Sequence, residues 1–202
     1  MTAKEIHSAL QSLLPATKIE LQQGQAGDPW LLVQSADLIQ VIQILKNNLG
    51  MNYLACLSGI DYETALGVVY QIRSLTGKFD VMIKVLIPKD NPVLSSLTKL
   101  YSAAEWFERE AYDLVGIQFQ GHPDLRRIMM PDDWIGYPLR KDYQAPADYH
   151  GIPCDRPDPH QLLVQLRTTS QQEKTVDPAG GTSAANTPAI NSSDQNQNST
   201  AG

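Results

Sequence analysis

The chain has 202 residues, 42% of them hydrophobic and 19% charged, which is typical of a soluble globular protein with one sizeable domain and some additional chain. Its formal net charge of -6 argues against a nucleic-acid-binding protein, whose electrostatic signature is a basic patch. No apolar run approaches the roughly 18–20 residues of a membrane-spanning helix, and residues 1–14 lack the layout of a signal peptide.

The first fifty residues are predicted to contain two helices separated by two short strands. A helix over residues 2–14 begins with a capping box of Thr2 and Glu5. Extended pieces follow at residues 18–21 and 30–33. A second helix opens at Ser35 and ends near Gly50. Its apolar stripe consists of Leu38, Val41, Ile42 and Leu45.

Three further stretches, 51–59, 67–74 and 79–87, have the alternation or composition of strands, and PKDNP at 88–92 breaks the sheet. Because strands and helices do not alternate regularly along the chain, their order indicates an α+β fold. We therefore expect an antiparallel (mixed) sheet with two to three helices on one face.

A third helix is predicted from Ser102, paired with Glu105 in a second capping box, to a C-terminal cap at Gly116. Its apolar arc consists of Ala103, Trp106, Phe107, Ala111 and Leu114, and its polar face carries a charge ladder of Glu105, Arg109 and Asp113.

Glu110 projects from within the apolar arc of this helix, between Trp106 and Leu114. A buried carboxylate must be paired, hydrogen-bonded or neutralised. The nearest candidate partners in the sequence are Arg126, Arg127 and Arg140, so we expect Glu110 to anchor the helix to an arginine of the following chain.

Residues 120–143 show no helical or strand periodicity, yet they contain many large apolar side chains as well as balanced charges. Such a segment either wraps its own domain or lies on a partner, and its composition favours the partner. The expected organisation is an α+β domain at 1–119, an extended docking segment at 120–160 and a mostly disordered, low-complexity tail at 161–202.

Motifs for nucleotides, iron–sulfur clusters, hydrolase nucleophiles and zinc proteases do not occur in the sequence. Three chemical alternatives remain open. Glu108 and Glu110 could form an acid/base pair, although residues two apart on a helix diverge. His122 with Asp124 could bind a metal, although a hydrogen-bonded turn histidine is the plainer interpretation. Arg126 with Arg127 could bind a phosphate, although salt bridges to nearby acids are the plainer interpretation.

The stretch EREAYDLVGIQFQGHPDLRRIMMPDDWIGYPLRKDY at 108–143 resembles the signature region of the C-type, 30 kDa subunit of the proton-pumping NADH:quinone oxidoreductase, respiratory complex I. The stretches NYLACLSGIDY and PKDNP are also similar to that family, and the resemblance covers roughly residues 28–150. It implies a non-catalytic, hydrophilic subunit of the peripheral arm, on the cytoplasmic side of the bacterial inner membrane, with the quinone-site subunits D and B as its main neighbours.

The resemblance also implies that this chain binds no cofactor, while the complex as a whole uses FMN, Fe-S clusters, NADH and quinone. The charged residues would then build an interface instead of an active site, with the arginines and Lys141 fixing the segment to its own domain and to the D-type neighbour. The interface or structural residues so identified are Glu108, Arg109, Glu110, Asp113, His122, Arg126, Arg127, Trp134, Arg140, Lys141 and Asp142.

Three other hypotheses compete with this one. The chain could be the equivalent scaffold subunit of a membrane-bound hydrogenase or of another relative of complex I with a different electron donor. It could be a stand-alone acid/base or metal enzyme that uses Glu108, Glu110 and His122. It could also be a generic adaptor outside any redox complex.

Overall fold

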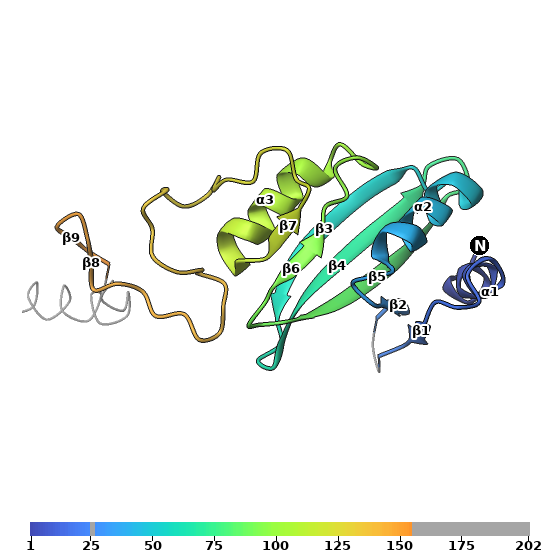
Figure 1. Cartoon of the computed structure of the whole chain (residues 1–202), viewed down its shortest axis with the longest axis horizontal. Helices are drawn as coiled ribbons and strands as arrows, with labels where there is room; N and C mark the ends of the chain where they lie inside the picture. Colours follow the sequence, from blue (N-terminus) through green and yellow to red (C-terminus); the bar gives the residue numbers. More distant parts are fainter. Residues whose placement is uncertain (25–26, 155–202) are drawn as a thin grey trace, which may run out of the picture. The chain divides into compact units, whose positions relative to one another are not determined.

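The computed structural model describes residues 1–24 and 27–154. The tail predicted at 161–202, and the last residues of the expected docking segment, lie outside this range. The elements are α1 Ala3–Leu13, β1 Ile19–Gln22, β2 Trp30–Val33, α2 Leu38–Leu49, β3 Tyr53–Asp61, β4 Ala65–Ser74, β5 Phe79–Pro88, β6 Val93–Ser95, α3 Ala104–Val115, β7 Gln118–Gln120, β8 Asp148–Tyr149 and β9 Ile152–Pro153 (Figure 1).

The central sheet has five strands in the order β1-β2-β5-β4-β3. All its neighbours are antiparallel except β2 and β5, which run parallel, so the expected mixed sheet is confirmed. The strands of the meander β3-β4-β5 are joined by short turns. Two small sheets, β6-β7 and β8-β9, lie outside the central sheet.

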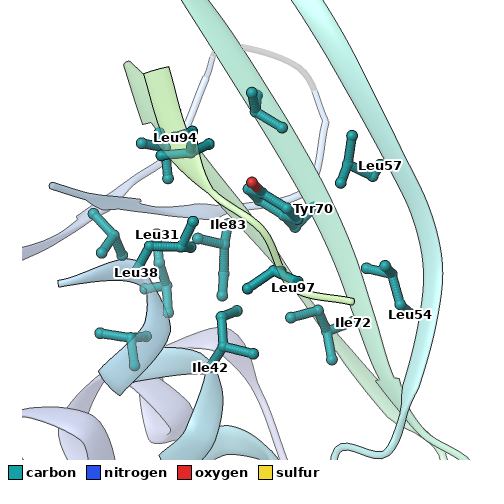
Figure 2. Close-up of a cluster of buried hydrophobic side chains, with 14 of the residues drawn as sticks. Leu31, Leu38, Ile42, Leu54, Leu57, Tyr70, Ile72, Ile83, Leu94 and Leu97 are labelled. Carbon is teal, nitrogen blue, oxygen red and sulfur yellow. The ribbon is translucent and has the colours of Figure 1, made fainter. Parts of the chain in front are cut away.

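The core lies between the sheet and its helices. Alternate residues of β4 and β5 are buried, as the period of two requires. The predicted stripe of α2 is fully buried, and α1 adds Ile6 and Leu10. Figure 2 shows part of this cluster, with the Tyr70 ring among leucine and isoleucine side chains.

The helix ends show which local signals were sufficient. Thr2 and Glu5 form the predicted capping box, and Gly50 and Gly116 end their helices in the left-handed conformation at φ +62° and +81°. The predicted starts at Ser35 and Ser102 are wrong. The N-caps are Asp37 and Ala103. Asp37 makes no side-chain capping bond, and Ala103 has no polar side chain that could make one.

Within the described residues, no helix has the length and apolar character that crossing a membrane requires.

Candidate functional site

Residues 121–147, here called the irregular segment, contain no helix or strand, as the sequence predicts. They are nevertheless fixed to the domain at several points, and most of these points lie on α3 or beside it. The contacts are polar, and they involve many of the charged residues that the sequence singles out.

The strongest attachment is formed by Asp113, whose side chain is completely buried. Its Oδ2 accepts hydrogen bonds from three successive backbone N–H groups, those of Ile128 at 3.0 Å, Met129 at 2.6 Å and Met130 at 2.9 Å. Its Oδ1 accepts from Arg127 Nη1 at 2.9 Å. Burial by itself raises the pKa of Asp113, but these donors outweigh it and hold the pKa below its usual value.

Arg127 connects α3 to two more turns of the segment. Nη1 also donates to the Asp113 carbonyl oxygen at 3.3 Å, while Nη2 donates to the carbonyl oxygens of Trp134 at 3.1 Å and Gly136 at 3.2 Å. The planar guanidinium fork can serve all these acceptors at once, which a lysine ammonium cannot. One arginine therefore sets the path of the chain from residue 127 to residue 136.

The segment also satisfies carbonyl groups at the end of α3 that have no partner within the helix. The Leu139 N–H donates to the Leu114 carbonyl oxygen at 2.9 Å, and Arg140 Nε donates to the Val115 carbonyl oxygen at 2.7 Å. The C-terminus of α3 is thus capped by residues more than twenty positions further along the chain.

Tyr137 packs on the helix terminus at Gly116. A Cβ atom at this position would lie 2.5 Å from Tyr137 Cε2, so the glycine is required by space as well as by its positive φ. The guanidinium carbons of Arg140 and Arg127 lie 4.7 Å and 5.5 Å from the ring centroid, within cation–π range.

A second attachment point is Asp61, at the end of β3. Its carboxylate pairs with Lys89 Nζ at 2.8 Å and accepts from the backbone N–H groups of Glu63 at 2.9 Å and Lys141 at 3.0 Å. The hydrogen bond from Lys89 and these N–H groups lower the pKa of Asp61 to about 2 against the opposing effect of burial. Sequence inspection missed Asp61, although an aspartate at a strand end before a turn is a recognisable signal.

His122 and Arg109 hold the beginning of the segment. The Asp124 N–H donates to His122 Nδ1 at 3.0 Å, so Nε2 carries the hydrogen and donates to the Glu105 carbonyl oxygen at 3.0 Å. Arg109 Nε donates to the Arg126 carbonyl oxygen at 3.4 Å. Arg126 itself pairs with Asp124 on the surface at 2.8 Å.

The remaining predicted residues lie further out on the segment. Trp134 Nε1 donates to Tyr143 Oη at 3.0 Å, and Lys141 Nζ pairs with Glu63 at 3.0 Å on the surface. Asp142 is exposed and, among the described residues, makes no hydrogen bond or ion pair.

The prediction for Glu110 is wrong, because Glu110 is exposed while Glu108 is fully buried. The charge ladder predicted on the polar face of the helix is also wrong, because Arg109 and Asp113 are buried and bind Arg126 and Arg127 of the segment. The reason is that α3 is covered on two sides. Ala104, Glu108, Ala111 and Val115 form the inner stripe, while Arg109 and Asp113 contact the segment.

The chemical alternatives can be compared with this geometry. Glu108 is buried and Glu110 is exposed, so the two carboxyl groups do not share a surface. Arg127 is bound to Asp113 and Arg126 to Asp124. Within residues 1–24 and 27–154, no three side chains of His, Cys, Asp or Glu are grouped as metal ligands would be.

Large apolar side chains remain exposed around this anchored segment. Ten large hydrophobic residues are exposed in the described chain, and half of them lie in α3 or after it. Ile135 is the most exposed, at 79%. The others in this group are Trp106, Met129, Leu139 and Ile152.

Relatives with known sequences match most of the described chain. The chain is 47% identical over 129 residues to the C subunit of NADH-quinone oxidoreductase from Chloroherpeton thalassium, an alignment that covers 61% of this chain and 54% of the relative. It is 41% identical over 141 residues to the C subunit from Moorella thermoacetica, covering 69% of this chain and 93% of the relative. The chain thus spans about half the length of the first of these relatives.

Solved structures show the same fold. A trypsin-resistant fragment (1-134) of Nqo5 is 30% identical, with a TM-score of 0.53 over 59% of this chain and 99% of the fragment. A chain of an archaeal membrane-bound sulfane sulfur reductase is 20% identical, with a TM-score of 0.58 over 89% of this chain and 95% of that one, which shows the fold alone. The family model described as "Respiratory-chain NADH dehydrogenase, 30 Kd subunit" matches residues 31–149. The chain therefore belongs to the 30 kDa subunit family of respiratory-chain NADH dehydrogenase, respiratory complex I.

Proposed function

We propose that this chain is a non-catalytic subunit of the peripheral arm of proton-pumping NADH:quinone oxidoreductase, and that the irregular segment docks it onto neighbouring subunits. The observation that carries this proposal is the exposure of Ile135, Leu139 and Met129 on a segment whose backbone is fixed by buried charges. A pre-ordered segment loses little conformational freedom on binding, so its apolar side chains can contribute fully to affinity.

The quinone-site subunits D and B are the proposed neighbours. In this assignment the chain itself holds no cofactor, and NADH, FMN, the Fe-S clusters and quinone are bound by other subunits. Electrons pass from NADH to quinone, coupled to proton translocation, within the complex that this chain helps to hold together. Membrane association is then indirect, through the complex, on the cytoplasmic side of the bacterial inner membrane.

The test is to isolate the complex from native membranes through a tag on this chain, identify the co-purified subunits and assay NADH–quinone reduction. Co-purification of the quinone-site subunits with this activity is the expected result. A large assembly that oxidises only hydrogen or another donor would assign the chain to a hydrogenase-type relative instead. Recovery of a monomer would overturn both assignments.

The surface itself is tested by the double variant Ile135→Asp/Leu139→Asp, with Leu75→Asp as the matched control. Leu75 is 58% exposed in the turn between β4 and β5, far along the chain from the segment. We expect the double variant to fold with unchanged thermal stability but to co-purify at least tenfold less of the other subunits. Equal recovery with both variants would show that the segment is not the docking surface.

A further inference from the structure

The environment of Glu108 disfavours the ionised form of its carboxyl group. It lies in the middle of α3, on the stripe that faces the sheet, and its relative exposure is 0%. Its Oε1 accepts one backbone hydrogen bond, from Leu97 N–H at 2.6 Å. Its Oε2 is buried and has no hydrogen-bond partner. Within the described chain, no lysine or arginine forms an ion pair with it.

Asp113 on the same helix shows what a buried carboxylate requires. Asp113 receives three backbone N–H groups and an arginine, whereas Glu108 receives a single N–H group and lies near the Ser96 hydroxyl. Leaving a buried charge without compensation is so unfavourable that the group binds a proton instead. The two carboxyl groups therefore have opposite protonation preferences, although they are only five residues apart.

The second buried group at this position is Tyr70 of β4. Its side chain is fully buried, and its Oη, like Glu108 Oε2, has no hydrogen-bond partner. Figure 2 shows the Tyr70 ring with Leu94 and Leu97 around it, and Leu97 supplies the N–H group that Glu108 accepts. Leu97 thus connects the two groups, because its N–H group binds Glu108 and its side chain lies in the same buried cluster as the Tyr70 ring.

The other titratable group near Glu108 is His122 of the irregular segment. Its Nδ1 accepts the Asp124 N–H group and its Nε2 donates to the Glu105 carbonyl oxygen, so both nitrogens are already engaged. A hydrogen on Nδ1 would point at the Asp124 N–H group, which donates to that same nitrogen. His122 is therefore not arranged as an imidazolium partner for an ionised Glu108.

We propose that Glu108 is a neutral carboxylic acid in the folded protein and that its proton is held on the side facing the Tyr70 hydroxyl. This proton site lies on the buried side of α3, and it is separate from the proposed docking function. The directions of the pKa shifts agree with the geometry. Burial raises the pKa of Glu108 and outweighs the lowering effect of the hydrogen bonds from Ser96 and Leu97. Burial also raises the pKa of Tyr70.

The first test is infrared spectroscopy of the folded full chain, which separates the carbonyl stretch of a protonated carboxyl group from that of a carboxylate. We expect one protonated-carboxyl band to persist above the pH at which exposed acids ionise, about 4.5. The band should disappear in Glu108→Gln and remain in the matched control Glu110→Gln. A wild-type spectrum without such a band, or a band that Glu108→Gln leaves unchanged, overturns the proposal.

Tyr70→Phe tests the position of the proton without removing the carboxyl group. Loss of the hydroxyl should shift the frequency of the same band, and an unshifted band would contradict the assignment to Tyr70. This variant also decides the question if Glu108→Gln does not fold, because the wild-type band and its response to Tyr70→Phe are then sufficient.

The second test follows stability with pH. Because the folded-state pKa of Glu108 is raised, proton binding stabilises the fold fully below the unfolded value and is lost as pH rises through the folded value. The difference in melting temperature between the wild type and Glu108→Gln should therefore fall with rising pH. The expected fall is about 3–5 °C for each tenfold by which Glu108 binds its proton more tightly in the folded than in the unfolded chain. A difference that is constant or grows with pH contradicts the proposal.

Discussion

The sheet domain and the irregular segment are held in place by different forces. The domain buries leucine, isoleucine and valine side chains on one face of its sheet and on α1 and α2. The segment buries little apolar surface and is fixed by Asp113, Arg127 and Asp61. Apolar burial is non-directional, whereas hydrogen bonds accepted by a carboxylate or donated by a guanidinium group define positions. The comparison shows how a chain without secondary structure can still have a defined path.

The largest expected effect comes from Asp113→Ala, which leaves three N–H groups and Arg127 without their acceptor. Breaking a buried charge pair from one side costs about 3–5 kcal/mol. Because the segment can detach locally, the loss should be seen first as faster amide exchange at residues 128–130 and then in denaturant unfolding. Asp132 is an exposed acid of the same segment, so the control variant Asp132→Asn should change neither amide exchange at residues 128–130 nor the unfolding free energy.

The same attachment should weaken in acid. The folded-state pKa of Asp113 is lowered, so its contribution is complete above the ordinary pKa of 3.8 and is lost as pH falls through the folded value. Exchange protection at residues 128–130 that did not respond to Asp113→Ala would show that the segment is held by other contacts.

Gly116→Ala should have the next largest effect, and Gly50→Ala is its matched control. Both glycines cap an α-helix at positive φ, so both alanines cost about 1–2 kcal/mol for the left-handed backbone. Only at Gly116 does the added Cβ meet Tyr137, and this overlap should add about 1–3 kcal/mol. Equal losses in thermal unfolding would mean that Tyr137 does not pack on the helix end in solution.

Arg127→Lys should cost about 1–2 kcal/mol, because one ammonium group cannot replace the bonds to Asp113, Trp134 and Gly136 together. Arg126→Lys is the control, since Arg126 makes a surface pair with Asp124 and should change stability by less than about 0.5 kcal/mol. Chemical denaturation measures the unfolding free energy of both variants. Similar losses would show that the buried bonds of Arg127 contribute no more stability than the surface pair of Arg126.

The smallest effect is expected for Glu110→Ala. Glu110 is exposed, so the change in unfolding free energy should stay within about 0.5 kcal/mol. A loss as large as that of Asp113→Ala would restore the sequence-based view that Glu110 is the buried anchor of the helix.

Much of the fold could be predicted, since its signals are local. Alternation predicted β4 and β5, and the Thr2–Glu5 capping box and Gly50 predicted helix ends. The irregular character of residues 121–143 followed from their lack of periodicity. The candidate residues were largely those that hold the segment, but their partners were not predictable, because Gly116 meets Tyr137 and Asp61 meets Lys141 across long stretches of chain.

The sequence by itself determined the five strands of the central sheet, most helix ends, the family resemblance and the composition of a segment suited to docking, but not the short strands β6 to β9. Only the tertiary structure decided which face of α3 is buried. A helix that packs against a sheet on one side and a polar segment on the other has no simple apolar arc. Glu108 therefore lies inside with one N–H donor, Asp113 inside with four donor groups and Glu110 in solvent. The burial of a carboxyl group depends on donors that other parts of the chain bring to it, and no local pattern records them.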